Sequence, residues 1–395
     1  MIKTIPIRDL RLGMYIESLG AGWMNHPFWR SSFRLERAED LKTLQQSGIQ
    51  AVMIDTAKGL DVEAAAQAAA RQTAPPEAKV APVRRVSYEE EIGRAKQVQA
   101  RARRVVINLF NQARMGQALD VQEVMPMVDE IYQSIDRNSD ALMNLMRLKS
   151  VDDYTYMHSV AVCVLMMSLG RRLGLDKSLL HQVGMAGLMH DVGKMGVPLE
   201  ILNKPGKLTD DEFTIVKSHP LQGWEILRSA NVTDEITLDV CLHHHERMDG
   251  AGYPNKLAGD GLTLYARMGA VCDVYDAVTS DRVYKKGWAP AEAIRRMAEW
   301  RDGHFDETVF QAFVKTVGIY PVGSLVRLNS GRLAVVAEQS DGSLLKPKVK
   351  VFFSTKSQEP VRLELIDLAR SQDGIKSPED PAAWGFDLNK LMGVA

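Results

Sequence analysis

Histidines are concentrated in one part of the chain. Of the nine histidines in the 395-residue sequence, seven lie between His158 and His245. Histidines placed independently on a surface or in a core would be scattered, so this segment is expected to bring several imidazole rings together.

The central motif of this segment is the pair His190-Asp191, which ends an apolar helical stretch and is followed by Val-Gly-Lys. Adjacent residues of a helix diverge by about 100°. His190 can therefore bind one metal ion while Asp191 uses its two oxygens to bridge that ion and a second. Lys194 returns to the same face and can meet a phosphate oxygen as a point charge. A lone His-Asp pair is more often simply solvated or hydrogen-bonded, so its neighbours decide between the two interpretations.

The neighbours supply further ligand types. His158 lies upstream, His219 stands in KSHP, and a triplet runs from His243 to His245. Asp273 lies in the apolar run AVCDVYDAV, where a buried carboxylate needs a partner. Imidazole and carboxylate ligands suit iron, manganese or zinc better than calcium or magnesium, and the lack of cysteine among them disfavours a structural zinc site. Two neighbouring ions activate water and stabilise both oxygens in an attack on a phosphodiester.

A turn with binding potential follows the triplet, in HHERMDGAGYP over residues 244–254. Gly252 allows close approach to a ligand, and Tyr253 offers a ring for stacking or a hydroxyl for hydrogen bonding. Such turns are often only structural, but the position directly after two histidines favours a function. Arg282 and Lys285, beyond Asp273, can hold phosphates, although such residues alone more often form a solvated face.

The periodicity of apolar residues predicts a mainly α protein. Residues 88–149 are expected to form connecting helices and residues 150–320 an all-α catalytic domain. Helical patterns cover residues 88–112, 121–135, 154–173, 177–189, 210–229, 264–279, 290–301 and 307–317.

The two ends of the chain have different patterns. Residues 1–60 mix β-prone runs with a helical pattern at residues 38–47, which predicts a small α+β accessory or regulatory domain. Residues 61–87 are rich in alanine and proline and predict a helix and a linker. Residues 321–395 are expected to form a small β appendage followed, from residue 371, by a loosely ordered tail.

Composition limits the possible partners. With a formal net charge of −1, no global field attracts a nucleic-acid polymer or an anionic membrane. The longest apolar run, residues 160–169, is about half the roughly 20 residues that span a bilayer, and the N-terminus lacks a signal-peptide core. The three cysteines form no CxxC motif and favour a reducing compartment. We therefore expect a cytoplasmic protein with a small anionic substrate.

These motifs resemble the HD-GYP family, a branch of the HD superfamily of metal phosphohydrolases. The resemblance lies, in order, in HSVAV, HDVGKMGVP, KSHPLQG, HHERMDGAGYP and AVCDVYDAVTSDRVYKK. It covers about residues 150–320, and the agreement of several separated motifs makes it specific. Segments such as RDLRLGMYI and LQQSGIQAVMID are similar to a region often found ahead of HD-GYP domains.

The resemblance implies hydrolysis of bis-(3′-5′)-cyclic dimeric GMP (cyclic di-GMP), a bacterial second messenger, to pGpG or GMP. It implies a two-metal centre, most often of iron or manganese, whose ligands are His158, His190, Asp191, His219, His244, His245 and Asp273. Asp191 would bridge the ions, and Lys194 would contact the scissile phosphate. Both residues would therefore act in catalysis. The nucleotide would be bound by Lys194, Gly252, Tyr253, Arg282 and Lys285.

Two positions refine this expectation. The matched histidine pair is the one before Glu246, so His243 is not expected to be a ligand. Some family members bind a third ion with a glutamate one turn before the first histidine, where this chain has Tyr154. A phenol is a poorer ligand than a carboxylate, so we expect two ions.

The sequence is also compatible with other functions. The chain can be a cyclic di-GMP receptor without turnover, although degenerate relatives usually lose metal ligands and this chain keeps the two-metal set. It can also act on another cyclic dinucleotide, since the motif does not separate guanine from mixed purines. The helices over residues 88–135 are a possible homodimer interface, and the N-terminal domain a possible site for a signalling protein.

Overall fold

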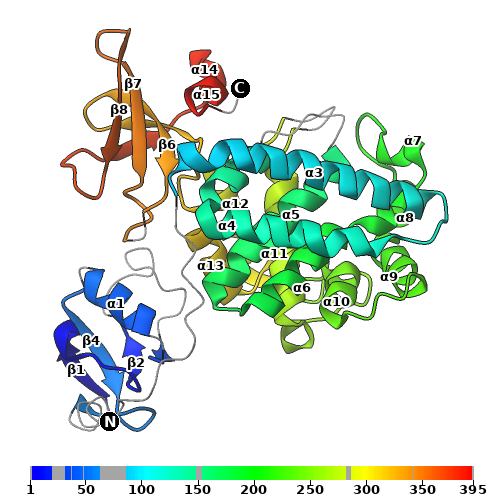
Figure 1. Cartoon of the computed structure of the whole chain (residues 1–395), viewed down its shortest axis with the longest axis horizontal. Coiled ribbons are helices and arrows are strands. Elements are labelled where there is room, and N and C mark those ends of the chain that lie inside the picture. The colour runs from blue at the N-terminus through cyan, green and yellow to red at the C-terminus, as the bar shows by residue number, and fades with distance from the viewer. Residues whose placement is uncertain are drawn as a thin grey trace.

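The computed structural model has an N-terminal α+β part, a helical part and a C-terminal β appendage (Figure 1). It describes residues 2–19, 32–36, 38–47, 49–62, 86–147, 154–281, 286–340 and 342–393. Most of the linker expected over residues 61–87 lies outside the described residues, as do Arg282 and Lys285. The mainly α fold class is confirmed. No helix in the described part of the chain combines the length and the apolar character needed to cross a membrane.

The N-terminal part is an antiparallel sheet with one α-helix. Its elements are β1 (Ile2–Pro6), η1 (Ile7–Asp9), β2 (Tyr15–Ser18), β3 (Phe33–Arg34), α1 (Ala38–Gln46) and β4 (Ala51–Asp55). The four strands lie in the order β1-β4-β2-β3. Ile5 pairs with Val52, and Ile16 pairs with Ile54. These four side chains and Leu44 of α1 are buried in a core of their own.

The helical part contains the segment with the clustered histidines. Its helices are α3 (Tyr88–Arg114), α4 (Val124–Arg147), α5 (Tyr154–Leu173), α6 (Lys177–Met189), α7 (Leu199–Leu202), α8 (Asp210–Val216), α9 (His219–Ser229), α10 (Glu235–His243), α11 (Leu264–Thr279), α12 (Pro290–His304) and α13 (Glu307–Val317). Short 3₁₀ turns are η3 (Val121–Glu123), η4 (Val192–Gly196) and η5 (Gly259–Gly261). The boundaries expected for α5, α6, α11 and α13 are confirmed.

One predicted helix is wrong. The segment 210–229 forms two helices, α8 and α9, instead of one. Pro220 lies in the first turn of α9. Its ring has no N–H to donate and clashes with the carbonyl four residues earlier, so a helix cannot continue through it. The break places His219 at the start of α9.

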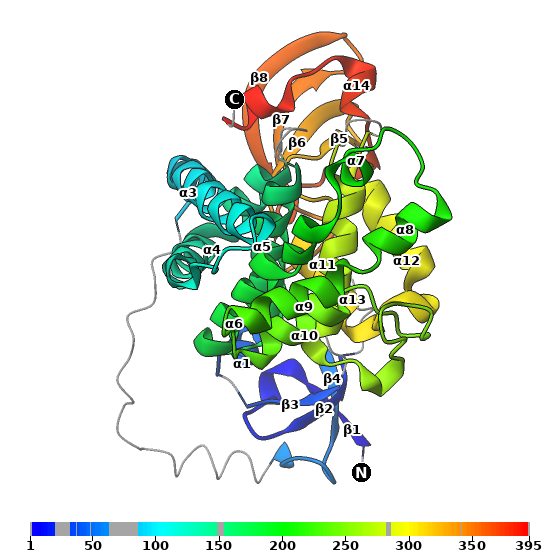
Figure 2. The same ribbon diagram turned by 90° about the vertical axis from the view of Figure 1, so that its right-hand side faces the viewer.

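Helix α5 is the centre of the helical part, and α3, α4, α6, α11 and α13 pack against it (Figures 1 and 2). Close contact between α5 and α6 depends on a small residue. A Cβ atom on Gly187 would lie 2.7 Å from the Cα atom of Cys163, so a larger residue would push the helices apart. This packing brings the end of α6 next to His158 on α5.

The C-terminal appendage is a five-stranded antiparallel sheet in the order β8-β7-β6-β5-β9. Its elements are β5 (Leu325–Leu328), β6 (Arg332–Glu338), β7 (Lys348–Ser354), β8 (Glu359–Asp367), β9 (Ile375–Pro378), α14 (Pro381–Trp384) and α15 (Leu388–Leu391). Figure 2 shows the sheet at one end of the helical part. Val326 and Val349 of the sheet share a hydrophobic core with Leu142 of α4.

The expectation of a loosely ordered tail from residue 371 is wrong. Strand β9 pairs with β5, and the rings of Trp384 and Phe386 pack on Phe353, with centroids 6.0 and 5.1 Å away. Aromatic rings gain free energy from such burial, which explains why this polar-looking segment is ordered.

Candidate metal centre

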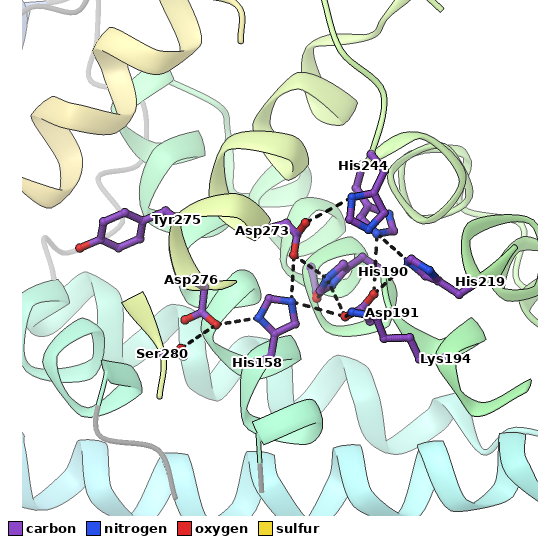
Figure 3. Close-up of polar contacts among 12 residues, drawn as sticks. His158, His190, Asp191, Lys194, His219, His244, Asp273, Tyr275, Asp276 and Ser280 are labelled. Carbon is purple, nitrogen blue, oxygen red and sulfur yellow. Dashed lines mark hydrogen bonds and ion pairs between the residues drawn. The ribbon is translucent and has the colours of Figure 1, made fainter. Parts of the chain in front are cut away.

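Seven predicted ligands from five helical segments meet in the interior of the helical part (Figure 3). They are His158 on α5, His190 and Asp191 after α6, His219 at the start of α9, His244 and His245 after α10, and Asp273 on α11. His158, His190, Asp191, His219 and His244 are each no more than 1% exposed, and Asp273 is 5% exposed. Six of the seven residues are therefore shielded from bulk water, whereas the side chain of His245 is 22% exposed.

Asp191 lies between two groups of histidines. Its Oδ1 atom is 3.3 Å from Nε2 of His219 and 3.7 Å from Nε2 of His244. Its Oδ2 atom is 3.4 Å from Nε2 of both His158 and His190. Each carboxylate oxygen thus belongs to a different group, which is the arrangement required of a bridging ligand.

Asp273 lies close to histidines of both groups. Its Oδ1 atom is 2.9 Å from Nε2 of His158 and 3.8 Å from Nε2 of His190, and its Oδ2 atom is 3.6 Å from Nδ1 of His245. In each of three sets, the possible ligand atoms lie within 4.8 Å of one another. They are His158-His190-Asp273, His190-Asp191-His244 and His219-His244-His245.

Backbone contacts orient three of the rings. Each ring places Nδ1 against a carbonyl oxygen: His190 against Gly187 (2.8 Å), His219 against Val216 (2.7 Å) and His244 against Val240 (3.0 Å). Because a carbonyl oxygen only accepts, Nδ1 must carry the proton in each case. Nε2 then faces the centre of the cluster and is the nitrogen left for a metal ion, as in metal-binding histidines.

The polar atoms of this cluster fit bound metal ions. Nε2 of His190 and Oδ1 of Asp191 are buried and have no hydrogen-bond partner within the described residues. Nε2 of His219 and Nε2 of His244 face each other at 3.2 Å, although both atoms are acceptors in this tautomer. Such groups are unfavourable in a dry site unless a cation lies among them. The donor set, imidazole and carboxylate without thiolate, suits iron, manganese or zinc.

Electrostatics favour the same conclusion. Burial alone would raise the pKa of Asp191, but the Lys194 ammonium and the His190 ring hold it well below its usual range. Burial lowers the pKa of His244 to about 4, so this ring is neutral at pH 7. Burial also opposes charge on His190, yet Asp191 and Asp273 raise its pKa to about 10. A divalent ion would replace that proton on binding.

Lys194 lies at the edge of the cluster. Its Nζ atom is 2.5 Å from Oδ2 of Asp191, and its side chain is 20% exposed, whereas Asp191 is fully buried. The ammonium is therefore the part of this ion pair that a ligand entering from solvent can reach.

The turn after the histidine pair also lies at the site. The rings of Tyr253 and His245 are stacked, with centroids 4.8 Å apart and an interplanar angle of 28°. Burial raises the pKa of Tyr253, so its hydroxyl remains a donor. A Cβ atom on Gly252 would lie 2.5 Å from the Cα atom of Glu246, so the turn can fold back only with glycine there.

One residue of the site was not predicted. Asp276 is 4% exposed and its Oδ2 atom lies 2.6 Å from Nδ1 of His158. It is one helical turn after Asp273 on α11. The spacing of two carboxylates by three residues in an apolar helix puts them on one face and is the signal that could have identified it.

Two other positions bear on the predicted metal set. His243 lies outside the three ligand sets, because its nitrogens face Asp239 and Asn255. Tyr154 begins α5, and its side chain lies outside the described part of the structure.

Comparison with known proteins gives two matched families. Residues 2–124 match a domain of unknown function, and residues 131–309 match the HD domain. The chain is 54% identical over 391 residues to a protein of Pseudomonas aeruginosa named as a cyclic di-GMP phosphodiesterase, covering 98% of this chain and 94% of the relative.

Two further matches are more partial. The chain is 33% identical over 159 residues to a Vibrio cholerae protein named as a 3′3′-cGAMP-specific phosphodiesterase, covering 40% of this chain and 30% of that protein. A solved HD-GYP-type protein of Bdellovibrio bacteriovorus aligns with a TM-score of 0.47 and 17% identity, covering 79% of this chain and 98% of that one.

Proposed function

The chain belongs to the HD-GYP family of cyclic di-GMP phosphodiesterases, and we propose that it hydrolyses cyclic di-GMP at the cluster around Asp191. The observation that carries the proposal is the position of Asp191, with one oxygen facing each group of histidines and Lys194 paired to it. This arrangement suits two-ion hydrolysis of a phosphodiester.

We infer that two divalent transition-metal ions, iron or alternatively manganese, occupy the cluster. One would be held by His158, His190 and Asp273, the other by His219, His244 and His245, with Asp191 shared between them. Bound there, the ions would supply the Lewis acidity that activates water and stabilises charge on the phosphoryl oxygens. Tyr154 in place of a carboxylate favours two ions over three.

The protein groups then position the substrate. Lys194, the solvent-facing member of its ion pair, would hold a non-bridging oxygen of the scissile phosphate and offset the charge that grows there. Tyr253 would donate a hydrogen bond or contact a base from its place on His245. Gly252 leaves room for the turn, and Arg282 and Lys285 keep their predicted role in holding phosphates.

The reaction breaks the bond between phosphorus and the ribose 3′ oxygen. Water adds to phosphorus, one of its protons goes to the departing 3′ oxygen, and linear pGpG with a 5′ phosphate results. A second hydrolysis of the same kind would give two molecules of GMP. We place this reaction in the cytoplasm, since all three cysteines are free and buried.

The test uses the full chain, purified without oxygen and loaded with Fe²⁺ or Mn²⁺. Cyclic di-GMP should be consumed, with pGpG or GMP resolved by chromatography. Asp191→Ala should lower the rate on the order of 10³-fold, because it removes the shared ligand and the partner of Lys194.

Asp129→Ala is the matched control for this loss. Asp129 also pairs with a histidine, at 2.9 Å from Nε2 of His181, but it lies on α4 outside the cluster. It should retain the wild-type rate. Hydrolysis by Asp191→Ala at the wild-type rate would rule out this centre.

The same assay decides between the alternatives. A receptor would bind cyclic di-GMP tightly and form no product even when both ions are present. A preference for mixed purines, as in the name of the Vibrio cholerae relative, would appear as faster cleavage of 3′3′-cGAMP than of cyclic di-GMP.

A further inference from the structure

His243, the first histidine of the triplet, is held in a polar network beside the centre. Its Nδ1 atom lies 2.8 Å from Oδ1 of Asp239, one turn earlier on α10. The other carboxylate oxygen of Asp239 accepts from the hydroxyl of Thr263 at 2.5 Å. A carboxylate accepts hydrogen bonds, so Nδ1 of His243 carries the proton and Nε2 of the neutral ring is an acceptor.

That acceptor binds the residue that follows the Gly-Tyr-Pro turn. The side-chain amide nitrogen of Asn255 lies 3.1 Å from Nε2 of His243 and donates to it. The backbone N–H of Asn255 donates to Oε1 of Glu246 at 2.6 Å. Glu246 is 2% exposed and directly follows His245. Asn255 is thus fixed twice, by its side chain to α10 and by its backbone to the residue after a predicted ligand.

These bonds at Asn255 restrict the position of Tyr253, which lies two residues earlier in the chain. The backbone N–H of Tyr253 donates to the carbonyl of His245 at a long 3.3 Å, and its ring lies on the His245 ring. Both of these contacts connect Tyr253 to His245. The loop around the turn is closed by the Asp249–Ala258 bridge, and inside it the two bonds at Asn255 hold the chain leaving Tyr253 against α10 and Glu246.

We propose that His243, Asn255 and Glu246 form a loop clamp that positions Tyr253 for binding cyclic di-GMP. The inference rests on the proposed function and deepens it. His243 is a positioning residue, since its ring nitrogens face Asp239 and Asn255 and not the metal cluster. Loss of the clamp should therefore weaken substrate binding while leaving metal loading and the chemical step nearly unchanged.

The experiment measures KM, kcat and metal content of the metal-loaded full chain. His243→Ala should raise KM about fivefold, the typical worth of one neutral hydrogen bond, and change kcat and metal content less than about twofold. Asn255→Ala removes the other side of the same bond but keeps the backbone N–H for Glu246, and should have the same effect. Because both variants break the same hydrogen bond, the KM of the double variant should not exceed that of either single variant.

Two further variants separate positioning from general stability. Tyr253→Ala should itself raise KM, and adding His243→Ala to it should change nothing more. His181→Ala is the matched control, since His181 also places one ring nitrogen on an aspartate but lies on α6 beside Asp129; its KM should equal that of the wild type. The clamp would be overturned by any of three results: an unchanged KM in His243→Ala, a double variant whose KM rises by the product of the two single effects, or an effect of His243→Ala on KM that persists in Tyr253→Ala. If the wild type forms no product, the proposed function fails instead.

Discussion

The contact between Asp276 and His158 places a carboxylate from outside the proposed ligand set against one of its members. His158 differs from His190, His219 and His244, because its Nδ1 atom faces a carboxylate oxygen at 2.6 Å instead of a backbone carbonyl. A buried carboxylate at this position fixes the ring and raises the basicity of the opposite nitrogen. If His158 is a metal ligand as proposed, Asp276 should tune its affinity for the ion.

Substitution of Asp276 tests this role. Asp276→Ala removes both the hydrogen bond and the negative charge, and metal affinity should fall about 10- to 100-fold. Asp276→Asn keeps an oxygen acceptor for Nδ1 without the charge, so its loss should be intermediate. The measurement is a titration of the metal-free protein with Mn²⁺, read out as bound metal and as activity. Equal affinity in all three proteins would mean that Asp276 has no part in orienting His158.

At the residue scale, the sequence predicts the candidate ligands better than it predicts the residues that orient them. The motifs around His190 and His244 contain chemically distinctive residues in fixed order, so the sequence alone predicts a convergent cluster. Asp276 and Asn255 were not expected. Their partners are 118 residues away in the first case and 12 in the second, and only the packing of α5 on α11 and the path of the turn bring them into contact.

At the element scale, helix boundaries could be predicted where a cap residue begins the pattern. Helices α6, α11 and α13 start after Asp176, Thr263 and Asp306, whose side chains accept a backbone N–H inside the first turn. The apolar periodicity over residues 210–229 predicts one continuous helix, but Pro220 excludes it. The C-terminal tail has no such local signal, because its order depends on rings that pack across the sheet.

The packing of α3 on α4 includes a buried ion pair that can be tested directly. Glu91 is fully buried and accepts from Arg137 at 2.7 and 2.8 Å and from Ser134 at 2.9 Å. Its hydrogen bonds raise the pKa of Arg137, so the guanidinium stays charged. Glu91→Ala leaves the guanidinium without its partner. Since Arg137 can still reach some water, we expect a loss of about 2–3 kcal/mol in the free energy of unfolding, measured by urea denaturation.

A second ion pair joins the same two helices and serves as the control. Arg101 lies 2.6 Å from Glu130, but the two side chains are 46% and 37% exposed. Exposed pairs contribute little, so Glu130→Ala should lower the free energy of unfolding by less than about 1 kcal/mol. Similar losses in Glu91→Ala and Glu130→Ala would contradict a special role for the buried pair.

At the scale of the whole molecule, the hydrophobic cores divide the chain differently from its secondary structure. The β appendage differs from the helical part in secondary structure, yet Val326, Leu328 and Val349 are buried in the same core as Leu142 and Leu145 of α4. The N-terminal sheet instead has a core formed from its own residues. The sequence indicates three parts by pattern, but shared burial between distant segments is not visible in local periodicity.

This division predicts two unfolding transitions. Leu328 and Ile54 are both fully buried aliphatic residues on strands, one in the shared core and one in the N-terminal core. Each truncation to alanine should cost about 2–5 kcal/mol in its own core. In calorimetry of the full chain, Leu328→Ala should lower the Tm of the transition that abolishes phosphodiesterase activity, because the sheet and the catalytic helices unfold together. Ile54→Ala should lower only the Tm of the N-terminal transition. At temperatures below that transition, its phosphodiesterase activity should equal that of the wild type. If Ile54→Ala shifts both transitions equally, the N-terminal core is not an independent unit; if Leu328→Ala leaves the catalytic transition in place, the appendage does not stabilise the site.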